Sequence, residues 1–419
     1  MSTPEASPRR VLLRRAVHLT LTAGCLSAIG LFFPHLLGTS WAGIAAAAGA
    51  VSPLLVALLL LVWALGLGAH TITACAALPG LSHRRALLLS LTGSAVANVL
   101  PVGGAAGIAL NGRMTKRWGF STASFASFTV VTNVWNILAK AFLPLILVPI
   151  ALALGAAVQQ GSALLIASAV TVPLIGGLTA WLLFGRSALP RLRRRLGLPA
   201  AGSVASAESD AAAGGRSEAA LEMVGAGGAL PTAEAVRTVG TLQTLDAVET
   251  VQTVETFQNA EEAAGEKPRT KERLRGLAHR FLEACETVRE RSAALARTRW
   301  HQLSFGLLLY MGLLLVLLVL CLHAGGATVP IGFVLLAFCG ERLLTLAGLT
   351  PGGLGVVELG LAAVLMMAPG ATAAGVGTGV LIYRLLTFGL EIPVGGALLA
   401  LWMWFDRSAS SRSLEGHLA

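Results

Sequence analysis

Seven ionisable side chains interrupt the most apolar stretches of this chain. They are Lys140, Glu341, Arg342, Glu358, Arg384, Glu391 and, as a residue that can stay neutral, His70. A charge in an apolar medium is costly unless a counter-charge or a water-filled cavity receives it. Each of these residues is therefore a candidate for binding a charged ligand. The alternative is that they form structural ion pairs, of which Arg384 with Glu358 is the most evident.

The stretch "LTPGGLGVVELG", Leu349 to Gly360, combines a helix breaker, several glycines and a glutamate. A proline suits the first turn of a helix, and glycines let backbones or ligands approach closely. The free N–H groups at such a helix start attract anions, including phosphate. The candidate binding residues here are Pro351, Gly352, Gly353, Gly355 and Glu358. Packing of small residues between helices explains the same glycines equally well.

An earlier stretch, "LPVGGAAG" (Leu100–Gly107), has a similar pattern, with Gly103 lying 249 positions before Gly352. The same separation aligns the apolar runs on either side, which indicates an internal repeat. Basic pairs flank the first stretch, whereas the second is expected at the opposite face of the membrane. We therefore predict two inverted copies, each containing a re-entrant hairpin. Gly103 and Gly104 are candidate binding residues, although helix packing accounts for Gly104 somewhat better.

The composition requires a membrane environment for most of the chain. It has 419 residues, of which 55% are hydrophobic and only 12% charged, and its mean hydropathy is +0.74. These values lie outside the range of soluble globular proteins. We predict an all-α polytopic membrane protein with about six transmembrane helices plus two re-entrant hairpins in an inverted repeat. The expected spans are Val17–Phe33, Val51–Leu78, Ser121–Leu154, Ser162–Phe184, Leu303–His323 and Ala371–Met403, and the hairpins are Ala86–Leu110 and Ile331–Met367.

The net charge of +10 is concentrated outside the apolar runs. Between Arg186 and Arg299 lie 17 of the 31 Lys and Arg and 15 of the 21 Asp and Glu. Basic residues near span ends mark the cytoplasmic side. We therefore expect a protein of the cell (inner) membrane with both termini and this insert in the cytoplasm. The predicted parts are a membrane half 1–185, an insert 186–299, a second membrane half 300–405 and a tail 406–419.

Most of the insert has the composition of a disordered linker, rich in Gly, Ala and Ser. From Lys271 onward, apolar residues recur at helical spacing among arginines, which predicts a basic amphipathic helix. We favour a solvated helix leading into the next span over a sensor of anionic lipids. The five cysteines are scattered, which indicates neither a disulfide framework nor a metal site. The basic N-terminus followed by an apolar run favours a first span over a cleaved signal peptide.

The stretch "LTPGGLGVVELGLAAVL" and the later "GVGTGVLIYRLLTFGLEIPVGGAL" resemble the C-terminal signature of the lysylphosphatidylglycerol synthase transmembrane-region family, a family of flippase-like integral membrane proteins. The earlier "NVLPVGGAAGIALNGRMTKRWGF" is similar to its N-terminal motif. The resemblance covers most of the chain outside the insert, which is not part of the family pattern. In the first motif the family places a Glu after the glycine, whereas this chain has no carboxylate there.

The resemblance implies a flippase-like protein that moves an anionic phospholipid or a lipid-linked sugar between leaflets. The alternative is a non-transporting scaffold that recruits a lipid-modifying enzyme or glycosyltransferase through the insert. We expect no enzyme activity, because the chain has no P-loop, no G-x-S-x-G motif and no His-rich cluster. No cofactor and no metal are expected. The expected partners are membrane lipids and a separate aminoacyl- or glycosyltransferase, but no nucleic acid.

Overall fold

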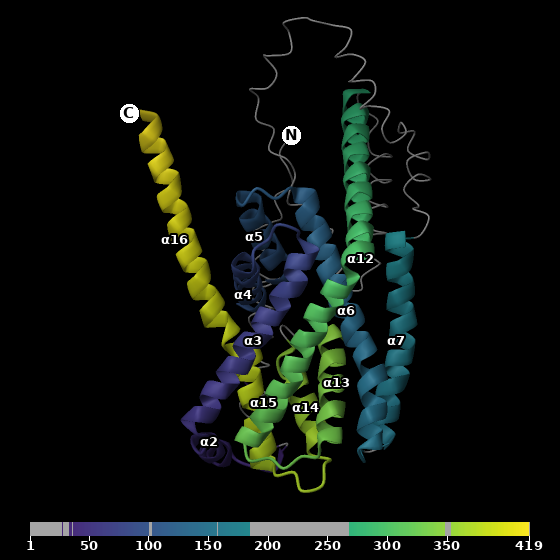
Figure 1. Ribbon diagram of the computed structural model, residues 1–419, viewed down its shortest axis with the longest axis vertical. Helices are drawn as coiled ribbons and strands as arrows, with labels where there is room; N and C mark the ends of the chain where they lie inside the picture. Colours follow the sequence, from purple (N-terminus) through teal and green to yellow (C-terminus); the bar gives the residue numbers. More distant parts are fainter. Residues whose placement is uncertain are drawn as a thin grey trace, which may run out of the picture.

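In the computed structural model, the described part of the chain is built from helices. It comprises residues 27, 33–35, 37–99, 103–156, 158–184, 268–347 and 353–418. The helices are α2 (Trp41–Gly49), α3 (Pro53–Ala77), α4 (His83–Val99), α5 (Gly103–Arg117), α6 (Thr122–Ala153), α7 (Val158–Phe184), α12 (Pro268–Ala324), α13 (Ile331–Ala347), α14 (Val356–Leu365), α15 (Ala373–Arg384), the π-helical turn η4 (Leu385–Gly389) and α16 (Glu391–Leu418). They form an elongated bundle (Figure 1).

Local sequence determines where several helices begin. The hydroxyls of Ser40, Ser52 and Ser121 accept hydrogen bonds of 3.1 to 3.3 Å from backbone N–H groups at the starts of α2, α3 and α6. Serine is favoured at this position because it satisfies a donor that the helix leaves unpaired. Pro53 occupies the first position of α3, where a proline needs no hydrogen-bond partner. The sequence analysis did not predict α2, although Ser40 and the alanine run after it were available signals.

The longest contact in the bundle is between α3 and α12, which run in opposite directions. A Cβ atom at Gly66 would lie 3.8 Å from the ring of Tyr310, and one at Gly306 would lie 2.7 Å from the hydroxyl of Thr73. The Thr73 hydroxyl also donates to the carbonyl of Leu303 over 3.3 Å. Residue numbers rise along one helix as they fall along the other. The C-terminal ends of α3 and α12 therefore lie at opposite ends of the bundle.

Each of these two helices is followed by a hairpin of short helices, α4–α5 after α3 and α13–α14 after α12. The hairpins therefore start from opposite ends of the bundle, and Figure 1 shows them there. A longer helical segment comes next in both cases, α6 in the first half and α15 to α16 in the second. This order is the inverted repeat that the sequence predicted, with two hairpins that enter the bundle without crossing it.

Four helical stretches are long and apolar enough to cross a membrane: Pro53–Ala77, Thr122–Ala153, Phe281–Ala324 and Ala373–Phe405. They correspond to four of the predicted spans, Val51–Leu78, Ser121–Leu154, Leu303–His323 and Ala371–Met403. In α7 the described apolar part, Ser162–Leu174, is shorter than a span. The expected first span, Val17–Phe33, lies almost entirely outside the described residues. The predicted amphipathic helix after Lys271 is present and continues without a break into the span as α12, a single helix of 57 residues.

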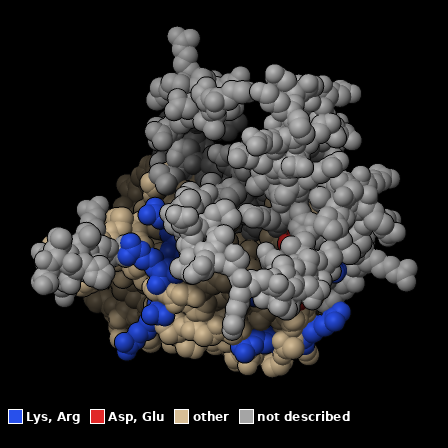
Figure 2. Space-filling view, turned by 90° about the horizontal axis from the view of Figure 1, so that it is seen from above, with Lys and Arg blue, Asp and Glu red and all other residues tan. Residues whose placement is uncertain are grey.

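Basic side chains gather at one end of the bundle, which we call the basic end. Its residues include Arg85, which lies over the ring of Trp118 with 5.1 Å between the guanidinium carbon and the ring centroid. Arg291 of α12 donates to the Ser124 hydroxyl over 2.8 Å and so ties this end of α12 to the start of α6. Figure 2 shows Lys and Arg on this face. The loops at the opposite end, 37–52, 154–156, 325–330 and 366–372, contain no Lys or Arg.

The predicted span Ala371–Met403 is not one regular helix. The π-helical turn η4 separates α15 from α16, and the Leu390 N–H donates to the Leu385 carbonyl over 2.6 Å. A π turn inserts an extra residue into the helical period and often marks a functional position. Arg384 and Glu391 are seven positions apart, which in a regular α-helix would place them on one face, and the π turn between them removes the basis of that inference.

Candidate functional site

The ionisable residues of the apolar runs are connected to one another by hydrogen bonds, ion pairs, a ring contact and electrostatic proximity. We call this group, together with two tyrosines, the polar cluster. Its members are His70 of α3, Lys140 of α6, Tyr310 of α12, Glu341 and Arg342 of α13, Glu358 of α14, Tyr383 and Arg384 of α15, and Glu391 of α16. Glu341, Arg342, Glu358 and Arg384 are buried. Residues that lie up to 321 positions apart in the sequence thus share a single site in an otherwise apolar bundle.

The first ion pair of the cluster joins two neighbours in the sequence. The guanidinium of Arg342 donates to both carboxylate oxygens of Glu341, from Nε over 3.0 Å and from Nη2 in a shorter contact. Nη2 also donates to the hydroxyl of Tyr383 over 3.2 Å, and that hydroxyl donates to Glu341 Oε2 over 3.3 Å. The ring of Phe338 lies 5.0 Å from the guanidinium carbon. Arg342 is therefore held by its own carboxylate, a phenol and an aromatic face.

The second ion pair connects the second hairpin to the helix that follows it. Arg384 Nε donates to Glu358 Oε1 over 2.7 Å, and the two side chains are only 10% and 4% exposed. The other carboxylate oxygen of Glu358 accepts the backbone N–H of Gly355 over 2.8 Å. The expected ion pair is thus present. The N–H of Gly355 is not free for an anion, as we had expected, because Glu358 already caps the start of α14.

Lys140 is the third cation of the cluster and is placed differently from the two arginines. Among the described residues, no carboxylate oxygen lies within 4 Å of its ammonium. It lies within electrostatic range of Arg342 and Glu341 and of His70. The ring of His70 packs at 4.9 Å from the ring of Tyr310. Lys140 is partly buried, as are Thr132 to Ala139 before it in α6. Its charge is therefore available to a ligand.

Glu391 is the third carboxylate, at the first position of α16. Its carboxylate lies within electrostatic range of Ser94 of α4 and of Arg384. No Lys, Arg or His nitrogen of the described residues lies within 4 Å of its carboxylate oxygens. The helix α16, which Glu391 begins, packs against α4 of the first hairpin.

The glycines of the two hairpins have different roles. In the first hairpin a Cβ atom at Gly103 would collide with the carbonyl of Ala97, and one at Gly107 would lie 2.8 Å from the carbonyl of Gly93. These glycines let α4 and α5 pack closely, while Gly104 is only partly buried at the start of α5. In the second hairpin Gly353 and Gly355 have positive φ angles of 72° and 82°, which L-residues with a side chain rarely adopt.

Two predicted site residues, Pro351 and Gly352, lie outside the described residues. The binding roles of the remaining candidates stay predictions.

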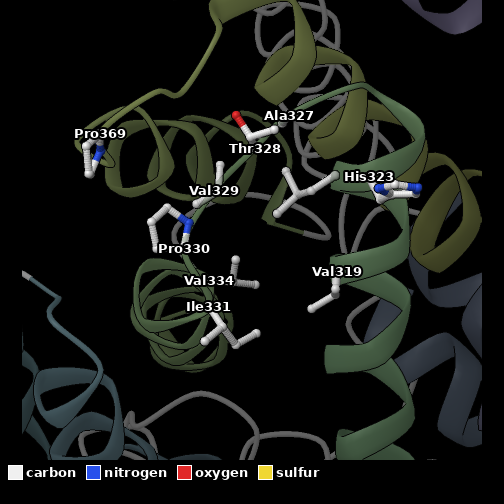
Figure 3. Close-up of a pocket in the computed structure, with 10 residues that line it drawn as sticks. Val319, His323, Ala327, Thr328, Val329, Pro330, Ile331, Val334 and Pro369 are labelled. Carbon is white, nitrogen blue, oxygen red and sulfur yellow. The ribbon is translucent and has the colours of Figure 1, made fainter.

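A pocket of about 500 Å³ lies away from the polar cluster, between the end of α12 and the start of α13. Its walls are mostly apolar, with His323 and Thr328 as its polar side chains (Figure 3). The Thr328 hydroxyl donates to the carbonyl of Gly370 over 3.4 Å, so this pocket is at the end without basic residues. None of the cluster residues lines it. No Lys, Arg, Asp or Glu is among the residues that line this pocket.

The sequence analysis missed the two tyrosines and Ser94. A signal was available, because the chain contains only two tyrosines, Tyr310 and Tyr383, and both lie inside apolar runs. A buried phenol needs a hydrogen-bond partner, so a tyrosine in an apolar run marks a neighbouring polar group. Ser94 carried no comparable signal, since serines are common in membrane helices as packing residues.

The arrangement can hold a charged group at membrane depth. The cluster contains three cationic side chains and three carboxylates. Its net charge is therefore zero when all six are ionised and His70 is neutral. No nucleophile is placed beside a base in a catalytic arrangement among the cluster residues. The site is suited to electrostatic binding, with Lys140 as the cation that has no close counter-ion.

Comparisons with known proteins agree with the second half of the repeat. Residues 267–395 match the family model described as the Lysylphosphatidylglycerol synthase TM region. The match starts at the beginning of α12 and so includes Lys267–Arg299, which the sequence analysis had placed outside the family pattern. The first proline-glycine stretch, whose resemblance we had also noted, lies outside the matched residues. No curated protein and no solved structure matches the chain.

Proposed function

We propose, from the membership of residues 267–395 in the lysylphosphatidylglycerol synthase TM-region family, that this integral multi-pass membrane protein moves a lipid with an anionic headgroup between the two leaflets. The headgroup is a phosphate-containing one, of a phospholipid or of a lipid-linked sugar. The protein acts as a carrier and not as an enzyme. The polar cluster is the site that the headgroup occupies on its way across.

The observation that carries the proposal is the convergence of the charged residues at one site in the bundle. Charges in a membrane protein are costly and are retained where a charged substrate passes. Arg342 and Arg384 are each held by a carboxylate, which leaves Lys140 to attract an anion. Lipid tails remain in the bilayer during such a movement, so only the headgroup needs a polar path through the protein.

The inverted repeat supports the same proposal. The two hairpins start from opposite ends of the bundle, α13 of the second hairpin carries Glu341 and Arg342 of the cluster, and α4 of the first hairpin packs against α16. In transporters with inverted repeats, small movements of one half against the other open the central site to either side in turn. We propose that the basic end faces the cytoplasm, since basic residues near span ends remain on that side.

Reconstituted vesicles test the proposal. The probes are fluorescent phosphatidylglycerol, fluorescent undecaprenyl phosphate and, as a zwitterionic control, fluorescent phosphatidylcholine, with movement followed by quenching of the outer leaflet. We expect the protein to accelerate at least one anionic probe and not phosphatidylcholine. The variant K140M should lose at least about tenfold of this rate, since one ion contact in low dielectric is worth more than about 1.4 kcal/mol.

The matched control is R297M, which removes an exposed cation from the outer part of α12 and should leave the rate unchanged. Equal movement of phosphatidylcholine would contradict a headgroup-selective site, and no movement of any probe would refute transport. Deletion of residues 202–265 distinguishes the carrier from the scaffold that recruits an enzyme through the insert. A carrier keeps its transport rate in vesicles after this deletion.

A further inference from the structure

One face of α6 turns toward the interior of the bundle and carries Asn136 at its centre. This face begins at Phe125, which is buried, and a Cβ atom at Gly112 of α5 would lie 3.1 Å from the Phe125 ring. It ends at Leu143, which is buried in the apolar core. Asn136 is eleven positions after Phe125 and seven before Leu143, which is about three and about two helical turns. The side chain of Asn136 therefore points inward and not toward lipid.

Asn136 also lies far from either membrane surface. It is 14 positions after Thr122, the first residue of α6, which places it about 21 Å along the helix. The hydrocarbon core of a membrane is about 30 Å thick. An amide at such a depth is costly unless it has a hydrogen-bond partner.

The other polar side chains nearby in α6 already have partners within the protein. The donors, over 2.8 to 3.1 Å, are the hydroxyls of Thr129 and Thr132, the amide of Asn133 and the indole N–H of Trp135. Among the described residues, neither the amide of Asn136 nor the ammonium of Lys140 takes part in a hydrogen bond. These two side chains thus have unused donors.

The inward face has free space beside these two donors. Asn136 and Lys140 are both partly exposed, whereas Leu143, in the next turn, is buried. After Lys140, α6 has no polar residue as far as its end. Before Lys140, polar side chains continue back to the start of α6 at the basic end. On α6, a headgroup therefore meets polar side chains only between the basic end and Lys140.

We propose that Asn136 binds the lipid headgroup by donating a hydrogen bond from its side-chain amide to an oxygen of the phosphate, while Lys140 supplies the counter-charge. The inference rests on the proposed function and adds a residue that determines how tightly the phosphate is held. Positions i and i+4 of a helix lie on one face with their Cβ atoms about 6 Å apart. One phosphate between Asn136 and Lys140 can therefore contact both. The headgroup reaches this position from the basic end.

A ligand-binding amide differs from a structural one in its effect on stability. The variant N136L replaces an amide that has no partner in the free protein with an apolar side chain of similar branched shape. The free energy of unfolding should therefore stay the same or rise. Binding of the phosphate should weaken about tenfold, because one hydrogen bond to a charged group is lost. N136D replaces the N–H donor with an anion that pairs with Lys140 and repels the phosphate, so its binding should be weaker still.

The test uses the full-length protein in detergent. Calorimetry with short-chain phosphatidylglycerol and with short-chain polyprenyl phosphate gives the Kd, and titration with sodium dodecyl sulfate gives the free energy of unfolding. T132V is the matched control. Thr132 lies one turn before Asn136 on the same face, but its hydroxyl donates to the Phe128 carbonyl within α6, so T132V should leave the Kd unchanged.

Four outcomes would overturn the assignment. A wild-type Kd in both N136L and N136D would refute the contact while leaving the carrier intact. A lower stability of N136L would show that the amide is structural. Equal weakening of binding in T132V and N136L would show a general disturbance of α6. Failure of the wild type to bind either probe would overturn the proposed function, and the contact with it.

Discussion

Replacing only one partner of the buried ion pair between Glu358 and Arg384 should lower the free energy of unfolding far more than replacing both. The two side chains are 4% and 10% exposed and are joined by a 2.7 Å contact. Removal of one partner leaves the other charge uncompensated, at a cost of about 3–5 kcal/mol in the free energy of unfolding. E358A should cost about 1 kcal/mol more than R384A, because the carboxylate also caps the Gly355 N–H.

The double variant E358A/R384A leaves no unpaired charge at this position and should recover most of that loss. We expect the double variant to be more stable than E358A. Its loss in free energy of unfolding should be smaller than the summed losses of the two single variants by about 2 kcal/mol or more. Unfolding in mixed micelles by titration with sodium dodecyl sulfate gives the three free energies. Lipid movement should stay lost in the double variant, because the site has lost a cation and a hairpin contact.

The control cycle uses E290A and R297A on the outer part of α12. Both residues are exposed, and their costs should add to within about 0.5 kcal/mol. Additive costs for E358A and R384A as well would refute a buried, mutually compensating pair. Normal lipid movement by the double variant would assign the pair to structure alone and leave Lys140 and Arg342 as the headgroup contacts.

Three further predictions concern topology, the Tyr383 bridge and helix packing. In a background without native thiols, a cysteine at Ser206 should be shielded from an impermeant thiol reagent in intact cells, and a cysteine at Thr372 should react. The reverse labelling pattern would show that the protein has the opposite orientation in the membrane. Y383F removes the hydroxyl between Arg342 and Glu341 and should cost about 1 kcal/mol of stability; no loss in micelle unfolding would mean that the hydroxyl is dispensable. G395A places a Cβ against the Leu91 carbonyl and should lower the free energy of unfolding by about 1–3 kcal/mol. The control G396A, whose Cβ would have nothing within 4 Å, should be neutral or stabilising. Equal effects of the two variants would contradict the packing of α16 on α4.

The helical architecture and the inverted repeat could be predicted because they depend on properties that the sequence states directly. Apolar runs of sufficient length locate the spans, and the shared proline-glycine pattern of the two stretches locates the hairpins. The pairing of Glu358 with Arg384 was also predictable, since both are charges in apolar runs on neighbouring elements. The π turn after Arg384 was not, because it depends on how α15 and α16 pack and no residue type specifies it.

The connectivity within the site was the least predictable part. Glu341 and Arg342 are adjacent, and neighbours in a helix ordinarily point in different directions, yet Tyr383 from another helix lies beside both side chains. The neighbourhood of Lys140 arises from contacts between α6 and α13, which tertiary packing alone determines. The N–H of Gly355 is not free, as we had expected, for a local reason: Glu358 is three residues after Gly355 and accepts its hydrogen bond.

The central claim is that a lipid headgroup enters the polar cluster, and photo-crosslinking in reconstituted membranes tests it most directly. The probes are phosphatidylglycerol and undecaprenyl phosphate with a photoactivatable diazirine at the headgroup, and mass spectrometry maps the sites of attachment. The account predicts adducts from at least one probe on α6 around Lys140 and on α13 around Arg342, reduced in K140M and unchanged in R297M. Adducts confined to the lipid-exposed outer face of α16, around Leu401 and Trp404, would contradict it.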